Sequence, residues 1–450
     1  MREGNLEAPT RHPIAWKTPG YYDEAAAVRE MERIFDICHG CRRCVSLCGA
    51  FPTLFDLVDE GATGELDGVE KQDFWKVVAQ CYLCDLCYLT KCPYVPPHEW
   101  NVDFPHTMLR AKAIQFKQGR VDAGSRLLAS TDLHGHLAGI PVVTQAVNAV
   151  NHTRPARAAM ETMLQVDRHA WLPSLATRRF RQVAPAAPAA QAAVVEGERT
   201  PGKVALFATC YVDYNEPGIG LDLLKVLAHN GIAWEVVPKE KCCGMPKLEL
   251  GDLASVEASM RANIPVLARY AREGWAIVSA VPSCTLMFKQ EIPLMFPDDA
   301  EVQAVREAMW DPFEYLAARR RDGLLRTEFP RSLGKVSYHV PCHSRVQNFG
   351  RKTEELLKMV PGTSVHTNER CSGHAGTFGV KKPTHEVAMK IGKPLFKRMA
   401  EHPAGGAPDY ISSDCPLGGH HIAQGFERNG LGAPRLEHPL SLLRMAYGLE

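Results

Sequence analysis

The stretch KCCGMP, residues 241–246, places Cys242 and Cys243 side by side before a glycine. A related stretch, RCSGHA, follows at residues 370–375. The flanking segments recur as well: GKVALFATC (202–210) resembles GKVSYHVPC (334–342), and IVSAVPSC (277–284) resembles ISSDCPLG (411–418). Because these landmarks keep their order and return about 130 residues later, the sequence predicts two copies of one structural unit.

Each copy alternates short apolar segments with amphipathic ones. In the first copy, residues 203–209, 233–237 and 275–281 have the composition of buried strands. Residues 219–231 and 253–274 have the apolar spacing of helices. The alternation predicts an open α/β sheet, and the cysteines follow the strands, where such sheets place their ligands. We therefore expect two repeated α/β lobes, related by pseudo-symmetry, whose cysteines face a shared crevice.

The two copies differ in their cysteines. Val281 replaces one cysteine of the repeated pattern in the first copy, while Ser372 and Gly418 replace two in the second. The candidate ligands are Cys210, Cys242, Cys243 and Cys284 in the first lobe, and Cys342, Cys371 and Cys415 in the second.

The second lobe leaves three outcomes open: a three-cysteine site, a lobe without metal, or a site that a histidine completes. The candidate histidines are His343, His374, His420 and His421. A nucleophilic pair of Cys342 and His343 is not favoured, because neighbours on a strand point to opposite faces.

Two further cysteine motifs lie near the N-terminus. CHGCRRCVSLCG starts at residue 38 and CYLCDLCYLTKCP at residue 81. Three thiols at this spacing wrap one [4Fe–4S] cluster, and the fourth cysteine reaches the other cluster in two-cluster ferredoxins. The rule predicts one cluster on Cys38, Cys41, Cys44 and Cys92, and another on Cys81, Cys84, Cys87 and Cys48. Zinc sites are the alternative, but they use pairs of cysteines rather than runs of three.

Composition narrows the class of protein. Fifteen cysteines among 450 residues, with no signal-peptide core at the N-terminus, favour metal binding in a reducing compartment over disulfides. The net charge of +1 gives no field that would attract nucleic acid. No run of eighteen apolar residues predicts a membrane span. No Gly-rich fingerprint for a dinucleotide follows a strand, so flavin or NAD binding by this chain is not predicted.

These signals divide the chain into four segments. We expect an α+β N-terminal domain that is mainly helical and ferredoxin-like (1–182), and an Ala/Pro linker (183–202). The two lobes follow at 203–333 and 334–450. Helices are expected at residues 23–37 and from residue 105 onward. An apolar run at 127–150 predicts a helical hairpin on the cysteine domain, with contact to a membrane surface or quinone as the alternative.

The chain resembles the iron–sulfur subunits that join a two-cluster ferredoxin domain to paired CCG domains. This family includes the iron–sulfur subunits of anaerobic glycerol-3-phosphate dehydrogenase, of heterodisulfide reductase and of glycolate oxidase. The motifs above carry the resemblance, together with HEWNVDFPHTMLR (98–110), CSGHAGTFGVKK (371–382) and IGKPLF (391–396).

The resemblance implies a function and partners. It implies electron transfer from a flavin-containing dehydrogenase, or a similar donor, towards a quinone or a protein acceptor. It implies a third iron–sulfur cluster, cubane or non-cubane, in the first CCG lobe, whose four cysteines match four of the five in the full motif. The expected location is the cytoplasm, including the inner face of the membrane. The alternative is a disulfide reductase of the heterodisulfide type, with a catalytic cluster in the CCG domain.

Overall fold

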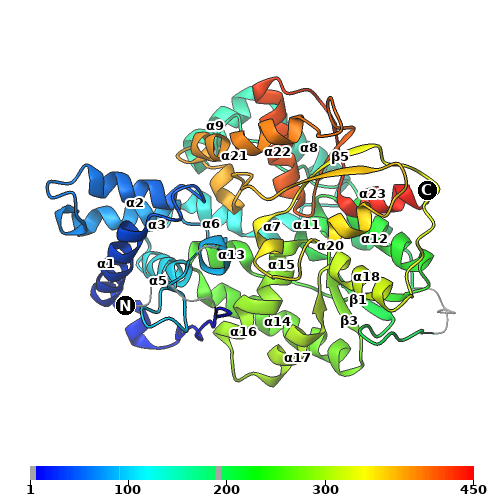
Figure 1. The fold of residues 1–450 in the computed structure, drawn as a ribbon, viewed down its shortest axis with the longest axis horizontal. Helices are drawn as coiled ribbons and strands as arrows, with labels where there is room; N and C mark the ends of the chain where they lie inside the picture. Colours follow the sequence, from blue (N-terminus) through cyan, green and yellow to red (C-terminus); the bar gives the residue numbers. More distant parts are fainter. Residues whose placement is uncertain (1–6, 91, 188–193) are drawn as a thin grey trace.

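The structure, a computed structural model, describes residues 7–90, 92–187 and 194–450. The first helices gather at one side of the molecule, and two α/β lobes with a helical insert beside them form the rest of it (Figure 1). The proposed linker therefore falls in part, at residues 188–193, outside the described residues. The four-segment division stays a prediction.

The first lobe is built on a parallel sheet of four strands. The strand order is β2-β1-β3-β4, and all neighbouring pairs are parallel. Its strands are β1 (Lys203–Phe207), β2 (Ala233–Val236), β3 (Ala276–Ser279) and β4 (Met309–Trp310). Every residue of β3 is buried, as expected for a strand covered on both faces. Its helices are α11 (Thr209–Tyr214), α12 (Pro217–His229), α13 (Met245–Leu250), α14 (Leu253–Arg272), α15 (Pro282–Leu286), a π-helix (Met287–Glu291), α16 (Ile292–Met295), α17 (Ala300–Ala308) and α18 (Pro312–Arg321).

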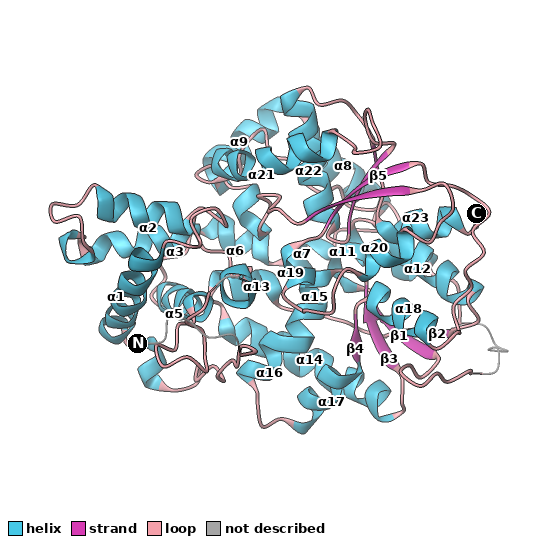
Figure 2. Cartoon of the chain, viewed as in Figure 1, coloured by secondary structure: helices cyan, strands magenta, loops and turns pink. Residues whose placement is uncertain are grey.

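The second lobe repeats this topology. Its strand order is β6-β5-β7-β8, again all parallel. Figure 2 shows its strands, in magenta around β5, apart from the magenta strands of the first lobe. The strands are β5 (Lys335–His339), β6 (Ser364–Asn368), β7 (Tyr410–Ser413) and β8 (Arg435–Leu436). The helices are α19 (Cys342–Arg345), α20 (Lys352–Leu357), the 3₁₀ helix Gly376–Gly379, α21 (His385–Ala400), α22 (Pro416–Asn429) and α23 (Pro439–Ala446). The prediction of two repeated α/β lobes is confirmed.

The N-terminal part is helical. Its helices are α1 (Glu24–Cys41), α2 (Ala50–Asp59), α3 (Phe74–Gln80), α4 (Leu86–Thr90) and α5 (Phe104–Lys117). The predicted helices at 23–37 and from 105 onward correspond to α1 and α5, where Asp23 and Asp103 accept the capping hydrogen bonds. Among described residues before 183 there is no named strand, so the expected strands of an α+β domain are not found. Cysteine loops and short helices occupy the chain that such strands would need.

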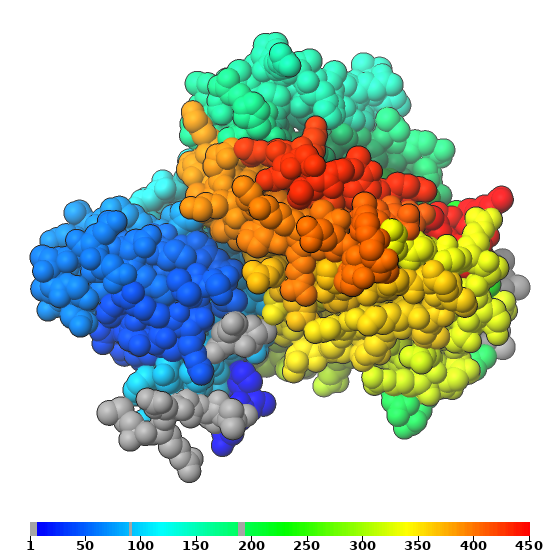
Figure 3. Space-filling model, turned by 45° about the horizontal axis from the view of Figure 1, so that its top comes forward, coloured from blue at the N-terminus to red at the C-terminus, as the bar shows by residue number. Residues whose placement is uncertain are grey.

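The apolar run at 127–150 folds differently from the predicted hairpin. It belongs to a longer insert of α6 (Ala123–Ala129), α7 (Thr131–Gly135), α8 (Pro141–His152) and α9 (Arg154–Leu164), followed by α10 (Phe180–Val183). Helix α6 contacts α13, and α7 contacts α11, so the insert rests on the first lobe. The chain after α9 pairs with the second lobe through an antiparallel bridge between Val166 and Lys381. Figure 3 shows the insert as the teal surface beside the orange and red second lobe.

A single apolar core joins the N-terminal helices to the first lobe and reaches β5. A smaller cluster lies between α21 and α22 in the second lobe. The segment before α1 contributes to the joint: Ile14 N–H donates to the Leu294 carbonyl at 2.8 Å, and Trp16 Nε1 donates to the Met295 carbonyl at 3.1 Å.

A buried ionic network reinforces the same joint. Arg11 donates to both oxygens of Asp85 at 2.6 and 3.1 Å, and to both oxygens of Asp103 at 3.0 and 3.1 Å. Its Nη1 also lies 3.5 Å from Glu291 of the π-helix. His106 bridges Asp103 and Glu291 at 3.2 and 3.3 Å. One guanidinium therefore ties the second cysteine motif, α5 and the first lobe together.

Candidate cofactor sites

The eight N-terminal cysteines separate into two groups. Cys38, Cys41, Cys44 and Cys92 line a small cavity of about 20 Å³. Cys48, Cys81, Cys84 and Cys87 line a larger cavity of about 490 Å³. The last cysteine of each motif thus lines the cavity of the other motif's cysteines. The crossed ligand sets that follow from the spacing stay a prediction.

The backbone of these motifs bends so that its thiols turn inward. Cys38 and Cys41 lie in the last turn of α1, which ends at Arg42 in the left-handed conformation with φ 50°. In the second motif, Leu83 and Asp85 also have positive φ, 54° and 59°. Successive left-handed and right-handed residues direct peptide N–H groups into a concavity, a geometry common at phosphate and Fe–S sites.

The thiols of each group are buried close together. Burial raises the pKa of Cys38, and the neighbouring thiols of Cys92, Cys44 and Cys41 raise it further. Burial, followed by the thiol of Cys81, raises the pKa of Cys48 to about 12. Thiolates gathered in this way repel one another, and a bound cation removes that repulsion. Soft sulfur donors in sets of four fit an iron–sulfur cluster.

The first lobe gathers its four cysteines at one edge of the sheet. Cys210 follows β1, Cys242 and Cys243 follow β2, and Cys284 follows β3. The thiols of Cys210 and Cys243 donate to Cys242, which lowers the pKa of Cys242 well below its usual value. Cys242, Cys243 and Cys284 are 1%, 3% and 4% exposed, so the group is shielded from water.

The glycine two residues after Cys242, and likewise after Cys371, shapes the turn. Gly244 has φ 98° and its N–H donates to Cys242 Sγ at 3.5 Å. Gly373 has φ 84° and its N–H donates to Cys371 Sγ at 3.3 Å. A Cβ on Gly373 would lie 2.0 Å from the Ala388 carbonyl oxygen of α21. Both positions favour glycine because their backbone is left-handed. Gly373 also needs to be a glycine because α21 approaches it too closely for a Cβ.

The insert also closes the first-lobe site, which the sequence did not predict. The N–H of Cys242 donates to Asp132 of α7, at 3.0 Å from Oδ1. Burial raises the pKa of Asp132, and the Cys242 thiol raises it further. Asp132 stands out in the sequence as an acidic residue in a fairly apolar run. Nothing in that run indicates that its partner is Cys242, 110 positions away.

The contact gives a testable prediction. We expect Asp132→Ala to expose the backbone at Cys242 to exchange, because a buried N–H loses its acceptor at a cost of about 1–3 kcal/mol. Hydrogen exchange followed by mass spectrometry of the 240–246 peptide measures this. Asp132→Asn keeps an acceptor oxygen and should retain most of the protection. Equal protection in Asp132→Ala and the wild type would show that the contact is not formed in solution.

The second lobe also places one cysteine after each of three strands. Cys342 follows β5, Cys371 follows β6, and Cys415 caps α22 after β7. Cys342 and His343 lie at the start of α19 rather than on a strand, so the strand-based argument about this pair was wrong. Burial and then the thiols of Cys371 and Cys415 raise the pKa of Cys342.

The four candidate histidines divide into two pairs. His343 and His374 line the large cavity, where burial lowers the pKa of each to about 4. His420 instead pairs with Glu216 at 2.5 Å and stacks on Trp171. His421 packs near His385 and Phe396, outside the cavity lining.

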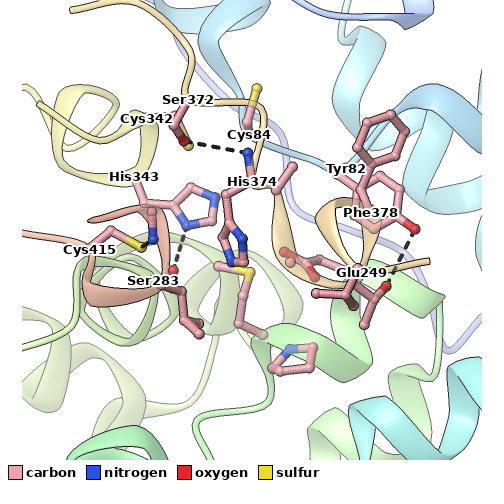
Figure 4. A pocket seen from close by; sticks show the side chains of 18 of the residues that line it. Tyr82, Cys84, Glu249, Ser283, Cys342, His343, Ser372, His374, Phe378 and Cys415 are labelled. Carbon is pink, nitrogen blue, oxygen red and sulfur yellow. Dashed lines mark hydrogen bonds between the residues drawn. The ribbon is translucent and has the colours of Figure 1, made fainter. Parts of the chain in front are cut away.

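All seven lobe cysteines share the large cavity with the second N-terminal group. In Figure 4, Cys342, Cys415 and His343 lie on one side, His374 lies in the centre, and Tyr82 and Glu249 lie on the other side. The shared cavity agrees with the predicted crevice between the lobes. Its cysteines are Cys48, Cys81, Cys84, Cys87, Cys210, Cys242, Cys243, Cys284, Cys342, Cys371 and Cys415.

Sequence reasoning missed three polar residues here: Tyr82 and Glu249, which line the cavity, and Lys112, which contacts both of them. Lys112 of α5 donates to the Glu249 carbonyl at 3.1 Å and lies 4.2 Å from the centre of the Tyr82 ring. Burial raises the pKa of the Glu249 carboxyl to about 7. Within the described ranges, no three His, Cys, Asp or Glu side chains form a ready-made site for a single metal ion.

The cysteine-rich domain named CCG matches residues 204–289 and 336–423, one copy in each lobe. Lactate utilization protein A of Bacillus cytotoxicus is 32% identical over 184 residues, 40% of this chain and 75% of that protein. The chain belongs to the family of iron–sulfur subunits with paired CCG domains. One subunit of the anaerobic glycerol-3-phosphate dehydrogenase of Escherichia coli (strain K12) is 28% identical over 339 residues, covering 75% of this chain and 80% of its own length.

A third relative widens the range of this family. One subunit of the fumarate reductase (CoM/CoB) of Methanothermobacter marburgensis is 30% identical over 256 residues, 56% of this chain and 48% of that protein. Such relatives are subunits of dehydrogenases and reductases. Membership therefore makes the chain an iron–sulfur protein of electron transport in the oxidoreductase class.

Proposed function

We propose that this chain is an electron-transfer subunit with two [4Fe–4S] clusters in its N-terminal part and a third cluster in the first CCG lobe. One observation carries the proposal: the second N-terminal cysteine group and the lobe cysteines line a single cavity. The ligands would be the two crossed groups of N-terminal cysteines and Cys210, Cys242, Cys243 and Cys284. When bound, such clusters accept and release single electrons.

We propose a route for electrons through the cysteine groups, because neighbouring groups lie close enough to raise each other's thiol pKa. Cys44 of the outer group interacts electrostatically with Cys87 of the inner group. Cys84 of the inner group interacts with Cys342 and Cys371 of the second lobe. Cys415 interacts with Cys284 of the first lobe. The route runs from the outer N-terminal group, close to the surface, into the cavity between the lobes.

The same arrangement supports a proposal for the partners. A flavoprotein dehydrogenase or similar redox protein would meet the N-terminal helices, next to the outer cysteine group. Cys38 and Cys92 are only partly buried in the chain alone, which leaves that group accessible to a protein surface. We assign the other end of the route, at the cavity, to a quinone or to a protein acceptor.

The insert supports a peripheral position at the inner face of a membrane. Leu133, Val142 and Met163, on α7, α8 and α9, are 60%, 78% and 78% exposed. We propose that these three exposed apolar side chains meet the lipid surface. Among the described helices, none is both long and apolar enough to cross a bilayer. We propose that this cytoplasmic surface rests on the membrane and brings a lipid-soluble quinone near the cavity.

Reduction and reoxidation test the function. Anaerobically purified protein is reduced with dithionite, freed from excess reductant and mixed with menadione as the probe quinone. We expect reduced-state EPR signals that vanish on mixing, because electrons leave through the clusters. Protein that shows no reduced-state cluster signal, or contains zinc alone, would refute electron transfer. Signals that survive menadione but vanish with a protein acceptor would restrict the acceptor to proteins.

A disulfide reductase is the second candidate, because cysteines of both lobes surround one cavity large enough for a small substrate. In that case reduced protein would cleave an added aliphatic disulfide to two thiols, consuming two electrons and two protons. An EPR signal of the oxidised protein that changes on addition of thiol would favour this candidate.

A further inference from the structure

The second lobe carries a cysteine arrangement that is incomplete in a specific way. Its three cysteines follow three adjacent parallel strands. Cys342 and Cys371 occupy the positions of Cys210 and Cys242, whereas Cys415 occupies the position that Val281 holds in the first lobe. The fourth thiol is absent at both positions where the repeat could supply it, because these positions hold Ser372 and Gly418. We propose that Cys342, Cys371 and Cys415 bind an iron–sulfur cluster that has one iron position without a cysteine ligand, open to the large cavity.

The three thiols converge on one place. All three line the same cavity. Two of them are oriented by backbone donors, since Gly373 N–H donates to Cys371 Sγ at 3.3 Å and Gly418 N–H donates to Cys415 Sγ at 3.4 Å. The thiol of Cys342 interacts electrostatically with both. Backbone donors of this kind are the usual supports of cluster thiolates.

Gly418 marks the position of the missing ligand. A Cβ built on Gly418 would lie 3.6 Å from Cys415 Sγ and 3.7 Å from Ser372 Oγ, both ordinary contact distances. The position therefore adjoins the thiol group and has room for a side chain. Because glycine offers none, one corner of the group has no thiolate from the protein.

An independent feature of the cavity indicates an occupant beside these thiols. His374 is 9% exposed and lines the cavity. Its Nε2 is buried and has no hydrogen-bond partner among the residues that the structure describes. Burial keeps the ring neutral, and a buried ring nitrogen without a partner is costly unless something in the cavity meets it.

Neighbouring groups place the proposed site in the middle of the route. On one side Cys84 interacts with Cys342 and Cys371, and Cys48 interacts with Cys371. On the other side Cys415 interacts with Cys284. The site therefore joins the N-terminal clusters to the first lobe, and its open iron position is where a molecule in the cavity would meet the route.

Iron exchange tests the proposal. A cluster held by three thiolates loses its fourth iron on mild oxidation and becomes a three-iron cluster, which is paramagnetic when oxidised. One ferrous ion, with one electron from dithionite, restores the four-iron form. We expect the oxidised wild-type protein to show an EPR signal that ferrous iron and dithionite abolish, with uptake of about one iron per chain. The deciding measurement is the EPR spectrum of the oxidised Gly418→Cys variant. Its added thiolate should hold the fourth iron, so the signal of the three-iron cluster should be absent.

Two further variants make the result specific. Cys371→Ala should remove the exchangeable signal together with about three to four irons, while signals of the N-terminal clusters remain. Ser372→Ala should leave both signal and exchange unchanged, because the proposal gives Ser372 no ligand role. Unchanged iron content in Cys371→Ala, or iron loss in Ser372→Ala, would overturn the proposal. Failure here leaves the proposed function intact, because that function depends on the cysteines of the first lobe and the N-terminal part.

Discussion

Cys243→Ala should remove one cluster and leave the N-terminal clusters intact. Cys243 is 3% exposed and lies beside Cys242 in the thiol group of the first lobe. The first-lobe site is built around four thiolates, so the loss of one leaves a buried iron without its protein ligand, whereas the second-lobe cluster is proposed with an iron position open to the cavity. We expect a loss of about four irons per chain, measured by iron and acid-labile sulfide analysis, with unchanged reduced-state EPR signals from the N-terminal clusters.

The matched control for this change lies in the second lobe. Ser372 occupies the position equivalent to Cys243, and Ser372→Ala removes a side chain of similar size from a similar turn. Its iron content should equal that of the wild type. If Cys243→Ala also retained all its iron, the assignment of a cluster to the first lobe would be wrong.

Arg11→Ala should destabilise the chain more than any surface substitution. The side chain of Arg11 is 9% exposed, and its removal would leave Asp85 and Glu291, which are 3% and 5% exposed, without their shared cation. Breaking a buried ionic group by removing one partner costs about 3–5 kcal/mol. The expected result is a large drop in the denaturant midpoint of anaerobically purified protein, accompanied by loss of iron from the inner N-terminal group.

Arg261→Ala is the control for Arg11→Ala. Arg261 pairs with Glu257 at 2.6 Å, but its side chain is 66% exposed, so the pair is screened by water. Removing it should change the free energy of unfolding by about 0.5 kcal/mol. Both variants are compared with the wild type by their denaturant midpoints. If Arg11→Ala lowered the midpoint no more than Arg261→Ala does, the network would not hold the N-terminal part to the first lobe.

The sequence predicted the features that follow local rules. Strands β1, β2 and β3 were predicted from short apolar segments, and their cysteines lie at the strand ends because parallel strands present their carboxyl ends at one edge. The internal repeat predicted the second sheet, because similar segments in the same order form the same elements. The crossed ligand sets of Cys48 and Cys92 follow from the rule for two-cluster ferredoxins and stay a prediction.

Contacts between distant segments could not be predicted in this way. Arg11 lies in a segment without periodicity, and its partner Glu291 is 280 residues away. The amide of Cys242 is satisfied by Asp132 of the insert, which was expected to pack on the cysteine domain. Lys112 and Glu249 come together only because α5 and α13 contact each other across the joint. Local patterns carry no information about such pairings.

The iron and acid-labile sulfide content of anaerobically purified protein tests the central claim most directly. Two N-terminal clusters and one in the first lobe require about twelve irons per chain, and the three-thiolate site raises the number to about fifteen or sixteen. We predict a value in that upper range, with a matching amount of sulfide. About eight irons would contradict the claim that the CCG lobes continue the electron route, and zinc without sulfide would contradict the account as a whole.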